Sequence, residues 1–270
     1  MRFAVVGHVE WVEFAKVERV PEPGEIVQAS DWWAEAAGGG GVASVRLARL
    51  AGSSTLYTAL GRDALGDQAF AQLTELGVRV EATRHTEAQR RGFTFVDGDG
   101  ERTITIIGEK HVPRGEDPLA WGELAGTDGV YFVSGDAAAA RAARRARVLV
   151  ATARVRPVLA EAGVELDALV RSASDPSERY ELGDLDPTPR LVVTTAGDEG
   201  GTWAAADGST GIYDPAPVPG PIADTYGAGD SFAAGLTYAL ASGEDPAAAI
   251  GFAARAASEA LTRRGAHGLG

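Results

Sequence analysis

Residues 224–235 combine the residue types that phosphoryl transfer to an alcohol requires. A Gly-Ala-Gly turn at 227–229 leads directly into an Ala-rich helical pattern, and Asp230 stands where that helix would begin. The first amides of a helix have no partner within the helix and lie at the positive end of its dipole, so they can hold an anion. A carboxylate beside them can take a proton from a hydroxyl group. The alternative interpretation is an aspartate that caps an ordinary helix.

The glycines at 38–41 are a second motif of interest. They precede a helical run, and Gly38-x-Gly40-x-x-Ala43 formally resembles a dinucleotide fingerprint. However, residues 31–37 do not form a clean strand pattern, and no acidic residue follows about 20 positions later. A loop whose backbone lies close to a ligand is one alternative, and a flexible loop is another. The interpretation of the chain as a nicotinamide oxidoreductase therefore rests on this loop alone.

A third motif, Thr195 to Gly200, follows a buried strand. A hydroxyl group and small residues at the carboxyl end of such a strand can reach phosphate groups, because ligands bind at that edge of open α/β sheets. A simple hairpin turn into residues 202–206 is the alternative. The acidic run at 97–101 imitates a calcium loop, but Arg102 stands where that loop needs glycine, so a hairpin turn is favoured. The four histidines lie far apart in the sequence, which speaks against a zinc site.

Short β-rich runs alternate with helical patterns along the chain. This alternation predicts a mostly parallel sheet with helices on both faces. The expected strands are 3–7, 55–60, 129–133, 148–150 and 191–195. The expected helices are about 43–50, 65–76, 136–145, 228–241 and 246–262.

Two regions interrupt the alternation and predict a small flap. Residues 25–29 are short and amphipathic, and residues 91–96 and 102–107 flank Asp97-Gly98-Asp99-Gly100, a hairpin signal. We expect these strands, within about 11–34 and 88–110, to form an antiparallel lid on the main sheet. The open edges of such a sheet are often covered, which predicts a homodimer through the lid.

Composition limits the partners and the compartment. The chain has 270 residues, 45% of them hydrophobic, and a net charge of −13. An acidic surface argues against nucleic acid or anionic membranes as partners. There is no cysteine, no signal peptide pattern and no apolar run long enough to span a membrane. These features predict a soluble, cytoplasmic protein with a small-molecule substrate.

In this order along the chain, the motifs make the sequence similar to the ribokinase-like (PfkB) carbohydrate kinase family over nearly its whole length. The most specific match is Asp224 to Asp230, which corresponds to the family signature. The resemblance implies one three-layer α/β/α domain over residues 1–270, with a mostly parallel central sheet and the antiparallel lid. The other matching segments are 3–7, 21–25, 38–41, 61–67, 76–78, 97–103, 195–200 and 262–266.

The resemblance also implies an ATP-dependent kinase. Such a phosphotransferase moves the γ-phosphoryl group of ATP to a hydroxyl of a small sugar, polyol or nucleoside-like substrate. Asp230 would deprotonate the hydroxyl, and the amides of Gly227, Ala228 and Gly229 would form an anion hole. The lid would close over the substrate and exclude water.

The implied cofactors are ATP, Mg²⁺ and a monovalent cation such as K⁺. The family's magnesium motif, Asn-x-x-Glu, is represented by Ser172 and Asp175, and Asp175 would bind Mg²⁺ through water. Ala254 stands where the family often has Asn in the penultimate helix. The nucleotide would lie along Thr195, Gly197, Gly200, Ser172 and Ala254. The monovalent cation would lie at Asp224, with backbone groups of Tyr226, Ala260 and Gly265.

The acceptor half departs from the family pattern. Where the family usually has Asn and then Asp two residues later, this chain has Glu10 and Val12. Ala43 and Gly40 replace a usual Asn and Lys. Losing groups that pair with substrate hydroxyls changes specificity strongly. A catalytically weak ligand-binding or regulatory protein is therefore the alternative function. We expect Glu10 to face the cleft, and the acceptor to contact Glu10, His8, Gly38, Gly39, Gly40 and Ala43.

Overall fold

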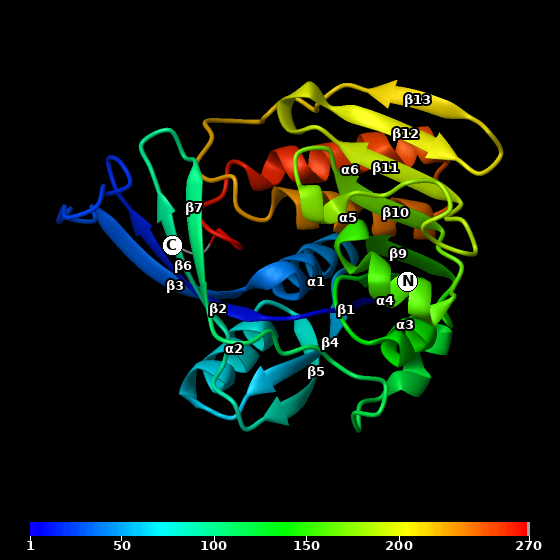
Figure 1. The fold of residues 1–270 in the computed structure, drawn as a ribbon, viewed down its shortest axis with the longest axis horizontal. Coiled ribbons are helices and arrows are strands. Elements are labelled where there is room, and N and C mark those ends of the chain that lie inside the picture. Colours follow the sequence, from blue (N-terminus) through cyan, green and yellow to red (C-terminus); the bar gives the residue numbers. More distant parts are fainter. Residues whose placement is uncertain (269–270) are drawn as a thin grey trace.

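The computed structural model describes residues 1–268 and is built around a nine-stranded sheet (Figure 1). Its strands are β1 (Phe3–Val6), β4 (Ser54–Gly61), β5 (Val78–His85), β8 (Gly129–Phe132), β9 (Val148–Thr152), β10 (Ala168–Ser172), β11 (Leu191–Thr195), β12 (Gly201–Ala205) and β13 (Thr210–Tyr213). The spatial order is β13-β12-β11-β10-β9-β8-β1-β4-β5. The pairs from β11 to β5 are parallel, and β12 and β13 are antiparallel. The mostly parallel sheet predicted from the sequence is confirmed.

Helices cover both faces of this sheet. The α-helices are α1 (Gly38–Ala51), α2 (Ala64–Glu75), α3 (Ala137–Ala143), α4 (Arg156–Ala162), α5 (Ala228–Ala241) and α6 (Pro246–Ala260), and short 3-10 turns are η1 (Trp121–Gly126), η2 (Ala153–Val155), η3 (Pro176–Glu178) and η4 (Gly197–Glu199). Residues of α1, α2, α5 and α6 share one core cluster with the sheet, and residues of α3, α4 and η1 share the other. Strand β1 is buried over its whole length because both layers pack against it.

The lid is a second sheet of four strands: β2 (Glu10–Lys16), β3 (Asp31–Ala37), β6 (Arg91–Val96) and β7 (Arg102–Ile107). Their order is β3-β2-β6-β7, with two antiparallel pairs and a parallel pair between β2 and β6. The lid projects from one side of the main sheet in Figure 1. Its inner face packs through Val12, Phe14 and Val96 against Val42 and Tyr226 of the main body.

Two expectations for the lid were wrong. Residues 25–29 form no strand, and they lie in the connection between β2 and β3. The apolar side chain of Ile26 is fully exposed, so no described residue packs on it. Residues 31–37, whose pattern was not that of a clean strand, form β3. Glu35 on this strand is polar but is 1% exposed, which interrupts the expected alternation.

The predicted helix starting near residue 43 begins earlier, at Gly38, and takes in all four glycines. Strands β5, β10 and β13 and helix α4 were not predicted from the sequence. Among the described residues, no helix has both the length and the apolar character needed to cross a membrane.

Candidate active site

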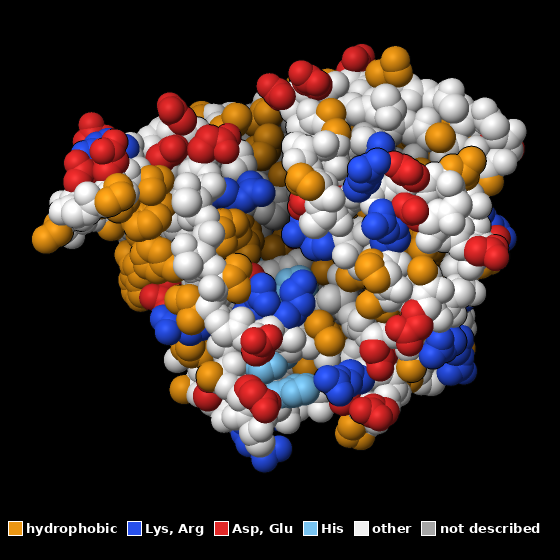
Figure 2. All heavy atoms as spheres, in the orientation of Figure 1, with side chains coloured by type: hydrophobic (Ala, Val, Ile, Leu, Met, Phe, Trp, Pro, Cys, Tyr) orange, Lys and Arg blue, Asp and Glu red, His pale blue; other side chains and the backbone are white. Residues whose placement is uncertain are grey.

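A polar residue stands at or just after the carboxyl end of each strand in a row of neighbouring parallel strands. His8 follows β1, Ser134 follows β8, Thr152 ends β9, Ser172 ends β10 and Thr195 ends β11. Because the carboxyl ends of parallel strands share one edge, these residues line one side of the molecule. Figure 2 shows a hollow between the lid and the main body, with Lys and Arg side chains gathered around it. The site is built around this edge.

Helix α5 presents unpaired amides at its start. Its N-cap is Gly227, which has a φ of 74° and no capping side chain. The first backbone bond of the helix is from Ser231 N to Gly227 O, at 2.9 Å. Within residues 1–268, the amides of Gly227, Ala228 and Gly229 have no hydrogen-bond acceptor. Aspartate side chains cap α2, α3 and α6, so the open start of α5 is a local feature that can hold an anion.

Asp230 lies in the first turn of α5, against the start of α1. A Cβ added to Gly39 would lie 3.0 Å from Asp230 Oδ1 and 2.6 Å from Val133 Cγ1, so only glycine fits there. The carboxylate is half-buried. Burial raises the pKa of Asp230 to about 6, although the nearby Arg154 guanidinium acts in the opposite direction. At neutral pH the group is therefore ionised and ready to accept a proton.

Arg154 connects two carboxylates beside Asp230. It lies in η2 and forms ion pairs with Asp175 Oδ2 at 2.5 Å and Glu178 Oε1 at 2.7 Å. Glu178 also accepts a hydrogen bond from Ser172 N at 2.7 Å, and its charge raises the pKa of Asp230. Neither Arg154 nor Glu178 was expected from the sequence to belong to a site. A magnesium ion bound through Asp175 would share this carboxylate with Arg154.

The other end of the cleft holds His8 and Glu10. His8 Nδ1 lies 3.1 Å from Ser134 Oγ, and His8 Nε2 lies 3.6 Å from Glu10 Oε1. Burial, followed by the charge of Lys110, lowers the pKa of His8 well below its ordinary value, so the ring is neutral at neutral pH. Glu10 is 6% exposed and accepts a 2.7 Å hydrogen bond from Arg90 Nε on the lid side.

Two neighbouring glycines connect these two ends. A Cβ on Gly38 would lie 3.2 Å from Glu10 Cγ and 3.3 Å from His8 Cδ2, while the next residue, Gly39, meets Asp230. The side chains of Glu10 and Asp230 therefore both lie against the first turn of α1, at neighbouring residues.

Two further residues proposed for acceptor contacts have other roles. Gly40 N donates a 3.0 Å hydrogen bond to His8 O, and a Cβ at Gly40 would lie 2.6 Å from the same oxygen. Gly40 thus allows α1 to pack on the turn after β1. Ala43 is fully buried in the main core and offers no surface to a ligand.

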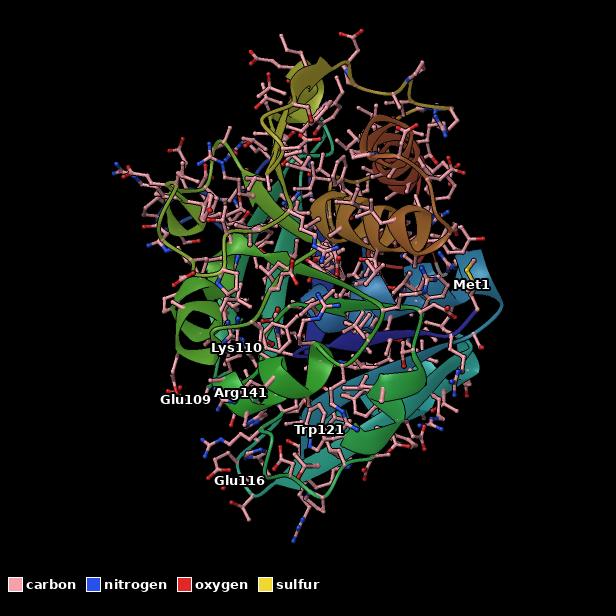
Figure 3. The ribbon with its side chains drawn as sticks, turned by 90° about the vertical axis from the view of Figure 1, so that its right-hand side faces the viewer. Met1, Glu109, Lys110, Glu116, Trp121 and Arg141 are labelled. Carbon is pink, nitrogen blue, oxygen red and sulfur yellow. The ribbon has the colours of Figure 1, made fainter. Side chains whose placement is uncertain are left out.

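Lys110 is a cleft residue that sequence reasoning missed. It follows β7 in the segment that leads to η1, and Figure 3 shows it nearer the middle of the molecule than its exposed neighbour Glu109. Burial and the charges of Arg90 and Arg154 lower the pKa of Lys110, whereas Glu10 and Asp230 act to raise it. Charged groups from both ends of the cleft thus act on the pKa of Lys110.

Arg102 ties the lid to the loop that precedes α5. Its Nη1 donates to Thr225 O at 2.6 Å and to Thr225 Oγ1 at 2.8 Å. The guanidinium also lowers the pKa of Asp230, so it lies close to the proposed base. The lid thus contributes a cation to the start of α5.

The loop after β11, where the family resemblance implies nucleotide contacts, is a tight turn. Thr195 Oγ1 donates to Arg171 O at 3.3 Å, and Gly197 and Gly200 have φ values of 61° and 78°, which favour glycine. Strands β11 and β12 pair in antiparallel fashion, so this loop is also the hairpin that the sequence left open. Ala254 is 8% exposed and packs in the core.

The residues expected at a monovalent cation site do lie together. Asp224 is 1% exposed, accepts a 2.7 Å hydrogen bond from Tyr226 N and a 3.1 Å bond from Gly265 N. Burial raises the pKa of Asp224. The carbonyl of Ala260 accepts a 3.0 Å bond from Arg263 N.

Glu35 adds a second buried carboxylate here, which the sequence did not indicate. Its Oε1 accepts a 2.7 Å bond from Ala266 N and would meet a Cβ on Gly265 at 1.9 Å. Its Oε2 is buried and has no hydrogen-bond partner among residues 1–268. Burial raises the pKa of Glu35 to about 7. A buried oxygen without a donor fits a cation bound beside Asp224.

Comparisons with known proteins agree with this architecture. Over 98% of its length the chain is 30% identical to an ATP-dependent ribose-1-phosphate kinase of Halopiger xanaduensis, of which it covers 94%. Ribokinase of Thermotoga maritima matches with a TM-score of 0.78 at 21% identity, over 99% of this chain and 95% of the other. Arabidopsis thaliana ribokinase complexed with ribose and ATP matches with a TM-score of 0.75 at 20% identity, over 98% and 93%.

The two solved structures establish the ribokinase-like fold, as predicted. A model of the pfkB family of carbohydrate kinases matches residues 2–125 and 164–268. Because these matches take in most of the chain, including the Asp224–Asp230 signature, the chain belongs to the pfkB family of carbohydrate kinases, which are phosphotransferases.

Proposed function

We propose that the protein transfers the γ-phosphoryl group of ATP to a hydroxyl group of a small sugar. The observation that carries this proposal is the position of Asp230, a half-buried carboxylate with a pKa of about 6, in the same helical turn as three unpaired amides. Proton removal and stabilisation of the transferred group then occur at adjacent atoms. The named relatives support ATP as the donor, since one is an ATP-dependent kinase and another was solved with ATP.

In the proposed reaction, Asp230 accepts the proton of the attacking hydroxyl. The oxygen of that hydroxyl forms a bond to the γ-phosphorus, and the bond from this phosphorus to the β,γ-bridging oxygen of ATP breaks. Amides of Gly227, Ala228 and Gly229 donate to the oxygens of the transferred group. Gly39 lets the start of α1 lie directly against the base, because a side chain there would meet Asp230 Oδ1 at 3.0 Å.

The remaining nucleotide contacts follow from the turn after β11. We propose that Thr195, Gly197 and Gly200 lie along the phosphates, with Ser172 beside them. Magnesium, when bound, would neutralise phosphate charge, and Asp175 is the residue proposed to hold it through water. Ala254 packs in the core, so its part is to leave space rather than to donate a bond.

For the acceptor, the relatives point to ribose and its derivatives, since they are ribokinases and a ribose-1-phosphate kinase. We propose that Glu10 accepts hydrogen bonds from sugar hydroxyls and that neutral His8 supports it from the side of β1. In this proposal they take over the role of the Asn and Asp of the usual family pattern, whose positions hold Glu10 and Val12 in this chain.

We propose two further features. A monovalent cation such as K⁺ is held at the segment that carries Gly265 by Asp224, as the family resemblance implies, and by Glu35, which the sequence did not indicate. The lid pairs with a second copy of the chain, because the edge strand β7 exposes Ile104, Ile106 and Ile107 by 40–45%. Light scattering at micromolar concentration should give the mass of a dimer, and a monomer would remove this part of the proposal.

The function is tested by ADP formation across a panel of sugars, sugar phosphates, polyols and nucleosides. We expect turnover with at least one pentose derivative and its loss in Asp230→Asn, with ATP binding retained. ATP binding in the absence of turnover for every acceptor would contradict the proposal. Acceptor binding without turnover would favour a ligand-binding or regulatory protein.

A further inference from the structure

One face of the main sheet is left open towards β13. Helices α3 and α4 pack on this face over β8, β9 and β10. Further along it, Thr202 and Ala204 of β12 and Ile212 of β13 are exposed. The alternate residues Trp203 and Tyr213 pack on the opposite face, in the core that includes α5 and α6. The open face therefore lies on the side of the sheet away from α5.

A hollow of about 930 Å³ lies over this face. Side chains of β10 to β13 form its floor, and the connection from β10 to β11 forms a wall with Tyr180, Leu182 and Pro189. Leu182 is 84% exposed, so it has little cover from the protein itself. Sites for small molecules have volumes of roughly 300–1,000 Å³ and mostly apolar linings. The hollow has the size and the lining of such a site.

A row of four residues crosses the floor from strand to strand. Arg171 of β10 is in register with Thr194 of β11, Thr194 with Thr202 of β12, and Thr202 with Ile212 of β13. All four line the hollow. Residues in register on neighbouring strands share a face, so a ligand lying along this row meets a cation at one end, two hydroxyl groups and then an apolar side chain.

The guanidinium of Arg171 is held by neutral oxygens alone. Its Nε donates to Thr194 Oγ1 at 2.8 Å, and its Nη1 donates to Tyr180 O at 2.9 Å. Within residues 1–268, Arg171 forms no ion pair and its Nη2 donates no hydrogen bond. Arg144 and Arg156, by contrast, each pair with an aspartate. Arg171 thus places a half-buried, uncompensated positive charge in a largely apolar hollow, although the chain has a net charge of −13.

We propose that this hollow is a second ligand site, for a small molecule that joins a carboxylate to an apolar body. Nη2 of Arg171 and the hydroxyl group of Thr202 hold the carboxylate, and the apolar body lies over Ala204 and Leu182. A guanidinium binds a carboxylate through charge-assisted hydrogen bonds, which are the stronger ones. One guanidinium balances one negative charge, which favours a carboxylate over a phosphate group.

Arg171 also connects the hollow to residues proposed for the nucleotide. Its carbonyl accepts a 3.3 Å hydrogen bond from Thr195 Oγ1, and Ser172 follows it on β10. Ser172 N donates to Glu178 Oε2 at 2.7 Å, two residues before Tyr180. A ligand that fixes Arg171 therefore acts on the backbone next to Thr195 and Ser172, and its presence should change the affinity for the nucleotide. This regulatory part rests on the proposed function, whereas the binding of the carboxylate does not.

The absence of cysteine from the chain allows a site-resolved test. Ala204→Cys places a thiol at an exposed position in the hollow, and Ser53→Cys places one at an exposed position outside it. Mass spectrometry follows alkylation by N-ethylmaleimide in the presence of 4-phenylbutyrate or its uncharged amide, 4-phenylbutanamide. We expect the carboxylate to protect Ala204→Cys at a concentration about tenfold lower than the amide does. Neither compound should protect Ser53→Cys.

Two variants in the Ala204→Cys background locate the carboxylate. Arg171→Gln should remove the preference for the carboxylate, whereas Arg145→Gln, the same change of charge at an exposed position outside the hollow, should keep it. Thr202→Glu supplies a carboxylate from β12 itself and should also remove the preference. Because Thr202 is exposed, this variant tests the site even if Arg171→Gln is unstable. Its charge-matched control is Ile26→Glu, at a fully exposed position outside the hollow.

Three results would overturn the inference. The first is equal protection by the carboxylate and the amide, or none by either. The second is a preference that survives in both Arg171→Gln and Thr202→Glu. The third is alkylation of Ala204→Cys that slows as the protein concentration rises without any added compound, because a second copy of the chain would then cover the face.

Isothermal titration with a non-hydrolysable ATP analogue tests the regulatory part. We expect saturating 4-phenylbutyrate to change the affinity of the native protein for the analogue by at least about fivefold, and to have no effect in Arg171→Gln. An unchanged affinity in the native protein would remove the regulatory part. Failure of the analogue to bind at all would count against the proposed kinase function, while the carboxylate preference would still stand.

Discussion

Replacing Asp230 with asparagine should abolish catalysis, because it removes the proposed base. The same substitution should stabilise the folded protein, because the buried surroundings of Asp230 disfavour a charged side chain. Burial raises the pKa of Asp230 from 3.8 to about 6. That difference corresponds to about 3 kcal/mol of unfavourable free energy for the ionised form. Asparagine has nearly the same shape and carries no charge, so it removes this cost.

The sign of the pH dependence follows from the direction of the shift. Between about pH 4 and pH 6 the folded native protein holds a proton on Asp230 that the unfolded chain has lost, so its stability falls as pH rises through this range. Above about pH 6 Asp230 is ionised in both states, and its contribution to stability no longer changes with pH. The stability advantage of Asp230→Asn should therefore be larger at pH 8 than at pH 5, by about 1 kcal/mol, and reach about 1–3 kcal/mol at pH 8.

Urea unfolding at pH 5 and pH 8 measures the stability, and ADP formation at pH 8 measures the activity, which should fall by about 10²- to 10⁴-fold. Asp245→Asn is the matched control. Asp245 caps α6 by accepting a 2.9 Å bond from Ala248 N and is exposed, and asparagine caps helices as well as aspartate does. The control should change neither quantity. An Asp230→Asn protein that is less stable than the native protein at pH 8, or that keeps its activity, would refute the reasoning.

Three further predictions concern neighbouring groups. Gly39→Ala should destabilise the fold by about 1–3 kcal/mol in urea unfolding, because its Cβ would meet Val133 and Asp230. Gly229→Ala, which has open space around its Cβ, should not lower the stability. Equal losses of stability in the two variants would contradict the packing argument. Arg154→Gln should move the acid limb of the kcat/KM profile to higher pH, because Arg154 lowers the pKa of Asp230; a shift to lower pH would be evidence against it. K⁺ should raise the melting temperature more than tetramethylammonium does, and this difference should grow as pH rises through about 7, where Glu35 ionises. Glu35→Gln should remove the difference between the two cations. The same response in the native protein and the variant would exclude Glu35 as a ligand.

Some of this protein could be predicted from the sequence because the signals are local. The alternation of buried strands with Ala-rich helices depends on nearby residues, and it gave the parallel sheet. The turn at Asp97–Gly100 gave the hairpin of β6 and β7. The Gly-Ala-Gly turn before Asp230 gave the open start of α5, because a helix start leaves its first amides unpaired wherever no side chain caps them.

The charged partners of the site were decided by the tertiary structure. Arg90, Lys110, Arg154 and Glu178 come from segments far apart in the chain, and nothing in their neighbouring residues shows that they share a cleft. They meet because β1, β8, β9 and β10 lie side by side and because the lid brings its cations over their carboxyl ends. Glu35 shows the same limit: nothing in the neighbouring residues marks it as buried, but the C-terminal segment covers it. Burial and electrostatic interaction depend on distances that only the folded chain fixes, so these residues and their shifted pKa values could not be predicted from their order in the sequence.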